Sequence, residues 1–476
     1  MEVLPTDCLN IIFEGLTDKS FFRITSTNSK FALLKKNKVI TNYYDIDDIL
    51  RHPVKNKYKF KYINCGKELI KDIPKTVTHI RFCYNFNDYI ENIPEGITHL
   101  EFISYEFNKP INNLPKTLTH LTLGYEFNQL VNNLPESLTH ITITGKFNQN
   151  INNLPKNLIY LALGTSFNKE VDNLPKNLKY LAVGTSFNQP INSLPETLEH
   201  LTLLGNCTNS SFDNLPKSLK YLKVGTHFNQ SLNNLPNGLI GLILGSKYKR
   251  SIEKLPESLK KLEIYSNISI DNIPNGLTHL ILGKKFNSPI DKLPDSIIHL
   301  ILDDDFNQEV NKLPSKLLFL RLGLKFNQDL NNLPKELKYL EISDFFNKSI
   351  DNLPDSIIEL KIGKYFNQQI NKFPLSLKYL EISDRFNKSI DNLPDSIIEL
   401  KIGTYFNQQI NKFPLSLKKI SIENSKYQFK FENIPASLKE FKIGIFNIED
   451  LNKIKKFIEK WNLYIDSWNS LLKFES

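Results

Sequence analysis

A 20-residue unit repeated along most of the chain restricts the possible folds more than any other feature. Nineteen prolines recur between Pro74 and Pro435, nearly all at intervals of 20 residues, with a few of 21 and one of 18. Each unit follows the pattern L-P-x-x-L-x-x-L-x-L-G-x-x-F-N-x-x-I-x-x. A fixed period of this size is typical of a solenoid, in which each turn packs on its neighbours. We therefore expect an extended binding surface and no enclosed pocket.

The alternation inside one unit predicts a short strand. Leu121 and Leu123 point to one side of that strand and Thr122 to the other. Successive copies should pair in parallel, about 4.8 Å apart. The return path is short and contains Pro and Asn, which are poor helix formers, so we expect it to be extended or turn-like.

The Phe-Asn pair predicts how the return path packs. Fourteen of the nineteen units carry it eight and seven positions before the proline. Stacked copies of the Phe would form an apolar spine, and the Asn would satisfy backbone groups in the turn. The 18-residue unit that ends at Pro274 lacks the pair, which predicts a local irregularity near Ser266.

The repeated residues resemble the FNIP repeats, a branch of the leucine-rich-repeat class found in amoebal and giant-virus proteins. Phe107-Asn108 through Phe406-Asn407, the Ile or Val that follows each pair, and the Leu-Pro carry this resemblance. It implies a repeat solenoid, a leucine-rich-repeat-like parallel β coil of about 19 turns, over residues 60–445.

The composition favours a protein of a reducing compartment. The four cysteines are scattered, and no apolar run approaches the ~18 residues that a membrane span requires. The net charge is +9, but basic and acidic residues alternate without blocks of one sign. A solvated surface therefore fits better than nucleic-acid binding. We expect a cytoplasmic monomer, in the host cytoplasm if the chain is viral, with no membrane, nucleic-acid or cofactor partner.

The first 45 residues predict a separate helical module, followed by a linker to about residue 60. Apolar residues spaced as on one helix face indicate a short helix. This segment resembles an F-box, the module that binds a Skp1-type adaptor in cullin ubiquitin ligases. The resemblance implies that the adaptor-binding residues are Leu4, Pro5, Leu9, Ile12, Phe13 and Leu16. The alternative is an amphipathic cap for the solenoid.

Residues five positions after each proline predict one column on the concave strand face. Seven of the nine histidines lie in it. A metal ladder is disfavoured, because side chains on parallel strands project side by side and do not converge. A stacked His/Tyr ladder retained from copied units and a partner-binding stripe both remain open. For the second, the predicted target-binding residues are His120, His140, Tyr160, Tyr180 and His200. Protonation of the imidazoles should then weaken binding between about pH 7.5 and 5.5.

Two further features concern the later repeats and the end of the chain. Residues seven after each proline are small in the first half and alternate in charge later, which predicts ion pairs between turns (Arg321, Glu341, Lys361, Glu381, Lys401). Residues 446–476 carry an apolar helical face and predict a C-terminal helical cap over the last turn.

No catalytic or metal-binding constellation is found in the sequence. Bacterial ubiquitin ligases that begin with similar repeats need a nucleophilic Cys in a C-terminal domain, whereas the last cysteine here is Cys207. We therefore expect a non-enzymatic substrate receptor, whose F-box binds the adaptor and cullin ligase while the solenoid holds an unknown target. The alternative is a protein-interaction scaffold with a degenerate F-box.

Overall fold

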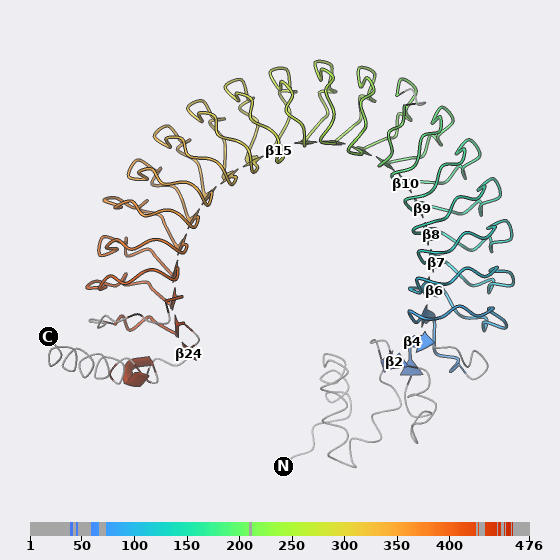
Figure 1. The fold of residues 1–476 in the computed structure, drawn as a ribbon, viewed down its shortest axis with the longest axis horizontal. Coiled ribbons are helices and arrows are strands. Elements are labelled where there is room, and N and C mark those ends of the chain that lie inside the picture. Colours follow the sequence, from blue (N-terminus) through green and yellow to red (C-terminus); the bar gives the residue numbers. More distant parts are fainter. Residues whose placement is uncertain are drawn as a thin grey trace, which may run out of the picture. The chain divides into compact units, whose positions relative to one another are not determined.

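The computed structural model describes most of the repeat region. It covers residues 59–65, 73–208, 212–424 and 434–444, with short pieces at 39–40, 44–45, 427, 446–448, 452, 454–457 and 459. The chain divides into two units, Met1–Gln230 and Ser231–Ser476, each of which is a coil of stacked turns (Figure 1).

A tight turn and a short strand begin each repeat. Pro115 starts the turn, and its carbonyl oxygen accepts the Leu118 amide at 3.0 Å. The strand follows two residues later. Its Leu121 and Leu123 are buried, and its His120 and Thr122 are half-exposed. A strand begins five residues after every one of the nineteen repeat prolines, so the predicted repeat boundaries are confirmed.

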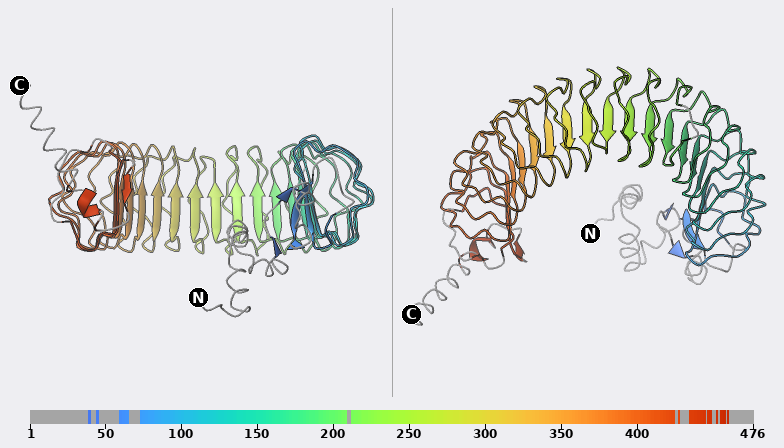
Figure 2. Two further views of the ribbon diagram at one scale, coloured as in Figure 1. Left: turned by 90° about the horizontal axis from the view of Figure 1, so that it is seen from below. Right: turned by 45° about the horizontal axis from the view of Figure 1, so that its top comes forward.

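Unit 1 holds one parallel sheet whose strands lie side by side (Figure 2). Consecutive strands of the repeats pair in register, so His120 faces His140 and Leu121 faces Ile141. The sheet strands are β2 (Tyr44–Asp45), β4 (Tyr62–Cys65), β5 (His79–Phe82), β6 (His99–Phe102), β7 (His120–Leu123), β8 (His140–Ile143), β9 (Tyr160–Leu163), β10 (Tyr180–Val183), β11 (His200–Leu203) and β12 (Tyr221–Val224).

Unit 2 repeats this arrangement with the same parallel register. Its strands are β13 (Gly241–Leu244), β14 (Lys261–Ile264), β15 (His279–Leu282), β16 (His299–Leu302), β17 (Phe319–Leu322), β18 (Tyr339–Ile342), β19 (Glu359–Ile362), β20 (Tyr379–Ile382), β21 (Glu399–Ile402), β22 (Lys419–Ile422), β23 (Glu440–Ile443) and β24 (Phe446–Ile448).

The phenylalanines of the Phe-Asn pairs form the predicted apolar spine within each unit. Phe127, Phe147 and Phe167 are fully buried, with ring centroids 6.2 and 6.1 Å apart. In unit 2, Phe346 and Phe366 stack at 6.2 Å. Between residues 73 and 424 the described return paths are turns and extended segments without helix, as predicted.

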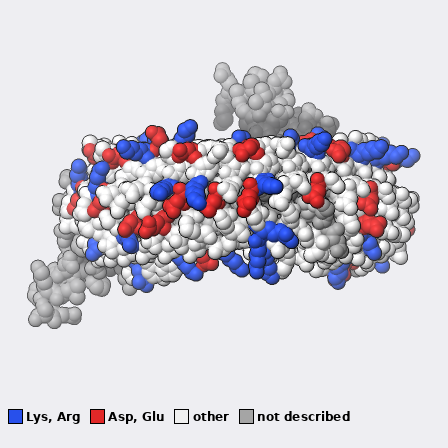
Figure 3. All heavy atoms as spheres, turned by 90° about the horizontal axis from the view of Figure 1, so that it is seen from above, with Lys and Arg blue, Asp and Glu red and all other residues white. Residues whose placement is uncertain are grey.

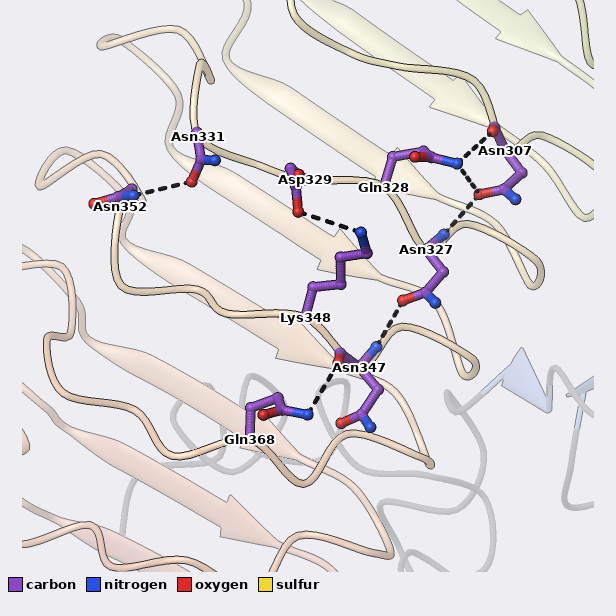
Figure 4. Close-up of polar contacts among 9 residues, drawn as sticks. All are labelled: Asn307, Asn327, Gln328, Asp329, Asn331, Asn347, Lys348, Asn352 and Gln368. Atoms are coloured by element: carbon purple, nitrogen blue, oxygen red, sulfur yellow. Dashed lines mark hydrogen bonds and ion pairs between the residues drawn. The ribbon is translucent and has the colours of Figure 1, made fainter.

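The asparagines bond to the neighbouring turn. The Asn327 side-chain carbonyl accepts the backbone amide of Asn347 at 3.0 Å, and Asn307 accepts that of Asn327 at 2.9 Å (Figure 4). A following glutamine adds to this: Gln328 Nε2 donates to the Asn307 backbone oxygen at 3.0 Å. The asparagine therefore satisfies backbone groups, as expected, and its partner lies one turn further along the chain.

Close approach of two turns explains the glycine at position 145, two residues after the end of β8. Gly145 has a φ of +63°, and a Cβ there would overlap the backbone of Tyr125 in the preceding turn. A side chain at this position would therefore force neighbouring turns apart.

The sheet continues beyond the clear repeats at the N-terminal side. Tyr44 pairs with Ile63, so β2 extends the sheet from the end of the segment predicted to be a helical module (residues 1–45), and the prediction of helix is wrong for these strand residues. Val39–Ile40 (β1) and Lys59–Phe60 (β3) form a separate two-stranded sheet. The residues predicted to bind the adaptor lie outside the described residues.

At the other end, β24 pairs with β23 in antiparallel fashion and occupies the last edge of the unit 2 sheet. Residues 452, 454–457 and 459 have helical backbone, with Ile454 buried and the Phe457 ring 6.2 Å from that of Phe441. The rest of the predicted cap lies outside the described residues.

Candidate functional site

The first residues of the strands in unit 1 form a continuous stack of rings, which we call the ring column. His79, His99, His120 and His140 lie with ring centroids 3.8, 4.0 and 4.2 Å apart. The stack continues through Tyr160, Tyr180, His200 and Tyr221, with centroid separations between 4.3 and 5.9 Å. The in-register pairing of the strands places these rings one above another.

A threonine on the same strand orients each imidazole at the start of the column. The Nδ1 atoms of His99, His120 and His140 lie 2.8, 2.9 and 2.9 Å from the hydroxyl oxygen of the preceding threonine. The contact between Thr78 and His79 is 2.7 Å. These bonds hold one ring nitrogen and leave the opposite edge of each ring facing away from its threonine.

The first four imidazoles of the column, those of His79, His99, His120 and His140, have pKa values below the usual value of 6.5. Burial, together with the charge of neighbouring groups, lowers the pKa of His79, His99 and His120 to about 4. Burial also lowers the pKa of His140. For His79, His99 and His120 these pKa values lie below the range of pH 7.5 to 5.5 over which binding was predicted to weaken. The sequence analysis used the reference pKa of a free imidazole, which ignores desolvation within the stack.

Beside the column lies a strip of small side chains. Thr122, Thr142, Ala162, Ala182 and Thr202 occupy the third position of β7 to β11 and pair in register. Their small size leaves the flank of the ring column open to a partner. The strip is bounded by Glu101 of β6, which forms an ion pair with Arg81 at 2.7 Å, and by Lys223 of β12.

In unit 2 the equivalent positions carry more charge. The column there contains Gly241 and Lys261, and a second ring stack runs from His279 to Tyr339. After Tyr339, the strands β19 to β23 begin with Glu359, Tyr379, Glu399, Lys419 and Glu440.

The predicted ion pairs form for the most part. Arg321 meets Glu341 at 3.0 Å, and Lys401 meets Glu381 at 2.6 Å. Lys361 differs, since its ion pair is with Glu359 of its own strand at 3.0 Å. The sequence alternation could not distinguish a partner on the next strand from one two residues away on the same face.

The five predicted target-binding residues lie together. His120, His140, Tyr160, Tyr180 and His200 are consecutive members of the ring column. Among the described residues no group of three or more His, Cys, Asp or Glu side chains could hold a metal ion.

Exposed aromatic residues just before the Phe-Asn pairs were missed in the sequence analysis. Tyr84, Tyr105 and Tyr125 form one group in unit 1, and the rings of Tyr84 and Tyr105 lie 6.1 Å apart. In unit 2, Phe345 stacks on Tyr365 at 5.0 Å, and the guanidinium of Arg385 lies 4.5 Å from the Tyr365 ring. Comparison of the positions one and two before each Phe would have found both groups.

The 18-residue repeat produces the expected irregularity. A hollow of about 330 Å³ lies there, lined by residues 249–253, 267–269, 271 and 272. The Ser266 hydroxyl is buried and has no hydrogen-bond partner, yet Asn267 still accepts the Asn287 amide at 3.0 Å. The asparagine bonding thus survives the shortened turn.

Charged side chains are interspersed on the surface opposite the strands. Figure 3 shows basic and acidic residues mixed across that face, without a large patch of one sign. Pairs such as Lys325–Asp305 at 2.7 Å account for part of this mixing. This distribution agrees with the sequence-based interpretation of a solvated surface.

A comparison with protein families identifies the repeat. The FNIP Repeat family matches residues 66–146, 167–206 and 209–425 in overlapping segments. The chain belongs to the FNIP repeat family. No curated protein matches the chain.

The solved structure of CroV588 supports the same architecture. The chain is 35% identical to the protein described as CroV588, a novel circular LRR protein structure, with a TM-score of 0.69 over 84% of this chain and 68% of that one. YopM from Yersinia enterocolitica WA-314 is 19% identical, with a TM-score of 0.45 over 78% of this chain and 92% of YopM. The FNIP repeat here therefore folds as a leucine-rich-repeat-like solenoid. In the described part of the chain, no helix has the length and apolar character needed to cross a membrane.

Proposed function

We propose that this FNIP-repeat chain is a substrate receptor in which the ring column of unit 1 binds a target protein. A leucine-rich-repeat-like solenoid is suited to protein–protein interaction, because it offers a long regular surface. The observation that carries the proposal is the uninterrupted stack from His79 to Tyr221 beside a strip of small side chains. Prearranged rings contribute contact area with little loss of side-chain entropy.

The N-terminal segment supplies the second half of the proposal. Its F-box-like pattern, carried by Leu4, Pro5, Leu9, Ile12, Phe13 and Leu16, supports binding to a Skp1-type adaptor of a cullin ubiquitin ligase. The receptor would then act in the cytoplasm, of the host if the chain is viral. Residues 446–476 would cap the last turn, with Ile454 and Phe457 packing toward the sheet.

Affinity capture of the full chain from a host-cell lysate, scored for Skp1 and cullin, tests the adaptor. Replacing Leu4-Pro5 by Ala-Ala should abolish capture of Skp1 while the solenoid stays folded. A His120→Phe/His140→Phe variant is the matched control, because it should keep Skp1 and lose target proteins. Equal Skp1 recovery with the Ala-Ala variant would reject the F-box and leave an interaction scaffold.

A further inference from the structure

The threonine before His120 determines which nitrogen of its ring carries the proton. The Thr119 hydroxyl donates to the carbonyl oxygen of Thr98 at 3.0 Å, and its oxygen lies 2.9 Å from His120 Nδ1. A hydroxyl has one proton, so the contact with the ring uses the proton of Nδ1. A neutral imidazole that donates from Nδ1 has a bare lone pair on Nε2. His120 therefore presents a hydrogen-bond acceptor at its Nε2 edge.

The same bonding recurs in the next turn. The Thr139 hydroxyl donates to the carbonyl oxygen of Thr119 at 3.1 Å, and its oxygen lies 2.9 Å from His140 Nδ1. Burial lowers the pKa of both His120 and His140 below 6.5, so the neutral form of both rings predominates near pH 7. Because the two histidines pair in register, adjacent turns carry two acceptors of the same kind.

A threonine hydroxyl accompanies each of these acceptors on the exposed face of the strand. Thr122 and Thr142 lie two residues after His120 and His140 and pair with each other in register. Residues two apart on a strand lie about 6.6–6.8 Å apart and share one face. In the described part of the chain, neither hydroxyl and neither Nε2 atom has a hydrogen-bond partner. Each turn thus offers an imidazole acceptor and a hydroxyl donor side by side.

This combination is specific to β7 and β8 among the seven histidines of the column. Four of the others have a charged or apolar residue where the second threonine would be (Arg81, Glu101, Ile281, Ile301). His200 is followed by Thr202 but preceded by Glu199, so its Nδ1 has no threonine beside it in the chain. The pair of an oriented imidazole and a free hydroxyl is therefore a local feature of two adjacent turns.

The surroundings of the two turns favour an uncharged occupant. The strands β7 to β10 contain no charged residue. On β6, Glu101 is already paired with Arg81 at 2.7 Å. A carboxylate or an ammonium group of a partner would lose hydration here without gaining a counter-charge. A primary carboxamide needs no counter-charge and carries an N–H donor and a carbonyl acceptor on neighbouring atoms.

We propose that β7 and β8 bind asparagine or glutamine side chains of an extended target segment. Each carboxamide N–H donates to a histidine Nε2, and each carboxamide oxygen accepts from a threonine hydroxyl, with His120 and Thr122 forming one site and His140 and Thr142 the next. With one hydrogen bond of about 2.9 Å on each side, a carboxamide bridges groups of this separation. This inference rests on the proposed function and specifies the chemistry of its target.

The tautomer is tested first, without any partner. Long-range proton–nitrogen NMR spectra of the full chain, labelled with 15N-histidine, report which ring nitrogen carries the proton. Single His120→Phe and His140→Phe variants assign the two signals. We expect Nδ1–H for both rings near pH 7. A proton on Nε2 of these rings would overturn the inference.

Binding is tested with a short acetylated and amidated peptide that alternates glutamine and alanine, so that the glutamines share one face when it is extended. Counterparts with glutamate or methionine in place of glutamine are the controls. Glutamate keeps only acceptors, and methionine has a similar length without either group. The glutamine peptide should bind about tenfold or more tightly than both. Equal affinity for the three peptides would overturn the inference.

Variants of the chain separate the two halves of each site. Thr122→Val/Thr142→Val keeps the side-chain shape, removes both hydroxyls and should lower affinity for the glutamine peptide about tenfold. Thr122→Ser/Thr142→Ser retains the hydroxyls and is the matched control, which should bind as the unchanged chain does. His120→Phe/His140→Phe keeps stacked rings, removes both acceptors and should lose a similar factor. Full affinity in the Val or the Phe variant would overturn the inference.

The two proposals fail in different ways. Unchanged capture of targets by the double Phe variant would reject the ring column as the binding surface. Loss of target capture in that variant, together with equal affinity for the three peptides, would keep the column as the target site and overturn the carboxamide inference. Target capture that is weakened by the Val variant and preserved by the Ser variant would support both.

Discussion

Each of the two units has the same kind of core, and the units differ on their exposed strand face. In both, buried phenylalanines stack at similar distances and asparagines join successive turns. The strand face of unit 1 carries neutral stacked rings, whereas that of unit 2 carries ion pairs such as Arg321–Glu341. The repeat therefore fixes the core residues and leaves the strand-face positions free to diverge, which allows one scaffold to carry two different surfaces.

The largest loss of stability should come from substitutions of the buried phenylalanines in the core of each unit. Phe147→Ala in unit 1 and Phe366→Ala in unit 2 each remove a fully buried ring and should cost about 3–5 kcal/mol locally. Hydrogen exchange of the flanking strands is the suitable measurement, because long repeat arrays do not unfold in one step. Markedly unequal costs would show that the two cores are not equivalent.

The asparagine bonds should contribute less. Asn148→Ala removes the acceptor for the Asn168 amide, now at 2.9 Å, and should cost about 1–3 kcal/mol by leaving that amide unpaired. Asn347→Ala, which affects the Asn367 amide at 2.9 Å in a more exposed setting, should cost less. Asn148→Asp keeps an acceptor and serves as the control; a loss as large as that of the Ala variant would contradict the role of the side-chain oxygen.

Acid should destabilise unit 1 at a higher pH than unit 2, because of the histidines in unit 1. Folding lowers the pKa of His79, His99 and His120 from 6.5 to about 4, so the unfolded chain binds protons first. Their contribution to stability is complete above pH 6.5 and is lost as the pH falls toward 4. Lys61 and His140 are the other charged or titratable groups that lower these pKa values.

The part of unit 2 that contains Asp351 and Asp391 should lose stability only at a lower pH than unit 1. Burial raises the pKa of Asp351 and Asp391, but hydrogen bonds from Asn371 and Asn411 outweigh it and hold both pKa values below their usual value of 3.8. Their contribution is present above pH 3.8 and is lost below it. Hydrogen exchange at pH 7, 5.5 and 4.5 should show β5–β7 losing protection before β19–β21. Simultaneous loss would contradict this order, and His99→Phe/His120→Phe should narrow the difference.

The smallest effect should come from the ion pairs of unit 2. Lys401→Met removes partners of Glu381 and Glu423, which lie 2.6 and 3.4 Å from the ammonium. Because these groups are partly exposed, the cost should stay at about 0.2–1 kcal/mol and fall with added salt. A larger loss of hydrogen-exchange protection in the flanking strands would show that these ion pairs stabilise the fold more than exposed pairs do.

Most of the fold could be predicted because residues one period apart occupy equivalent positions in successive turns. The repeat prolines located the nineteen strands from β5 to β23, and the Phe-Asn pairs located the spine and the turn-to-turn bonds. The site was less predictable. Sequence placed His120 and His140 in one column, but the burial that lowers their pKa values arises only when neighbouring turns stack, and the residue pattern does not report it.

The in-register bonding of Asn327 to Asn347 affects how such a chain can change length over generations. Each asparagine side chain needs only the backbone amide of the residue one period later, so a duplicated segment arrives with its acceptors and donors already matched. Residues 340–378 and 380–418 differ only at Phe345/Arg385 and Lys364/Thr404, all at exposed positions. Whole turns can thus be gained without new compensating substitutions, and divergence can begin at the surface.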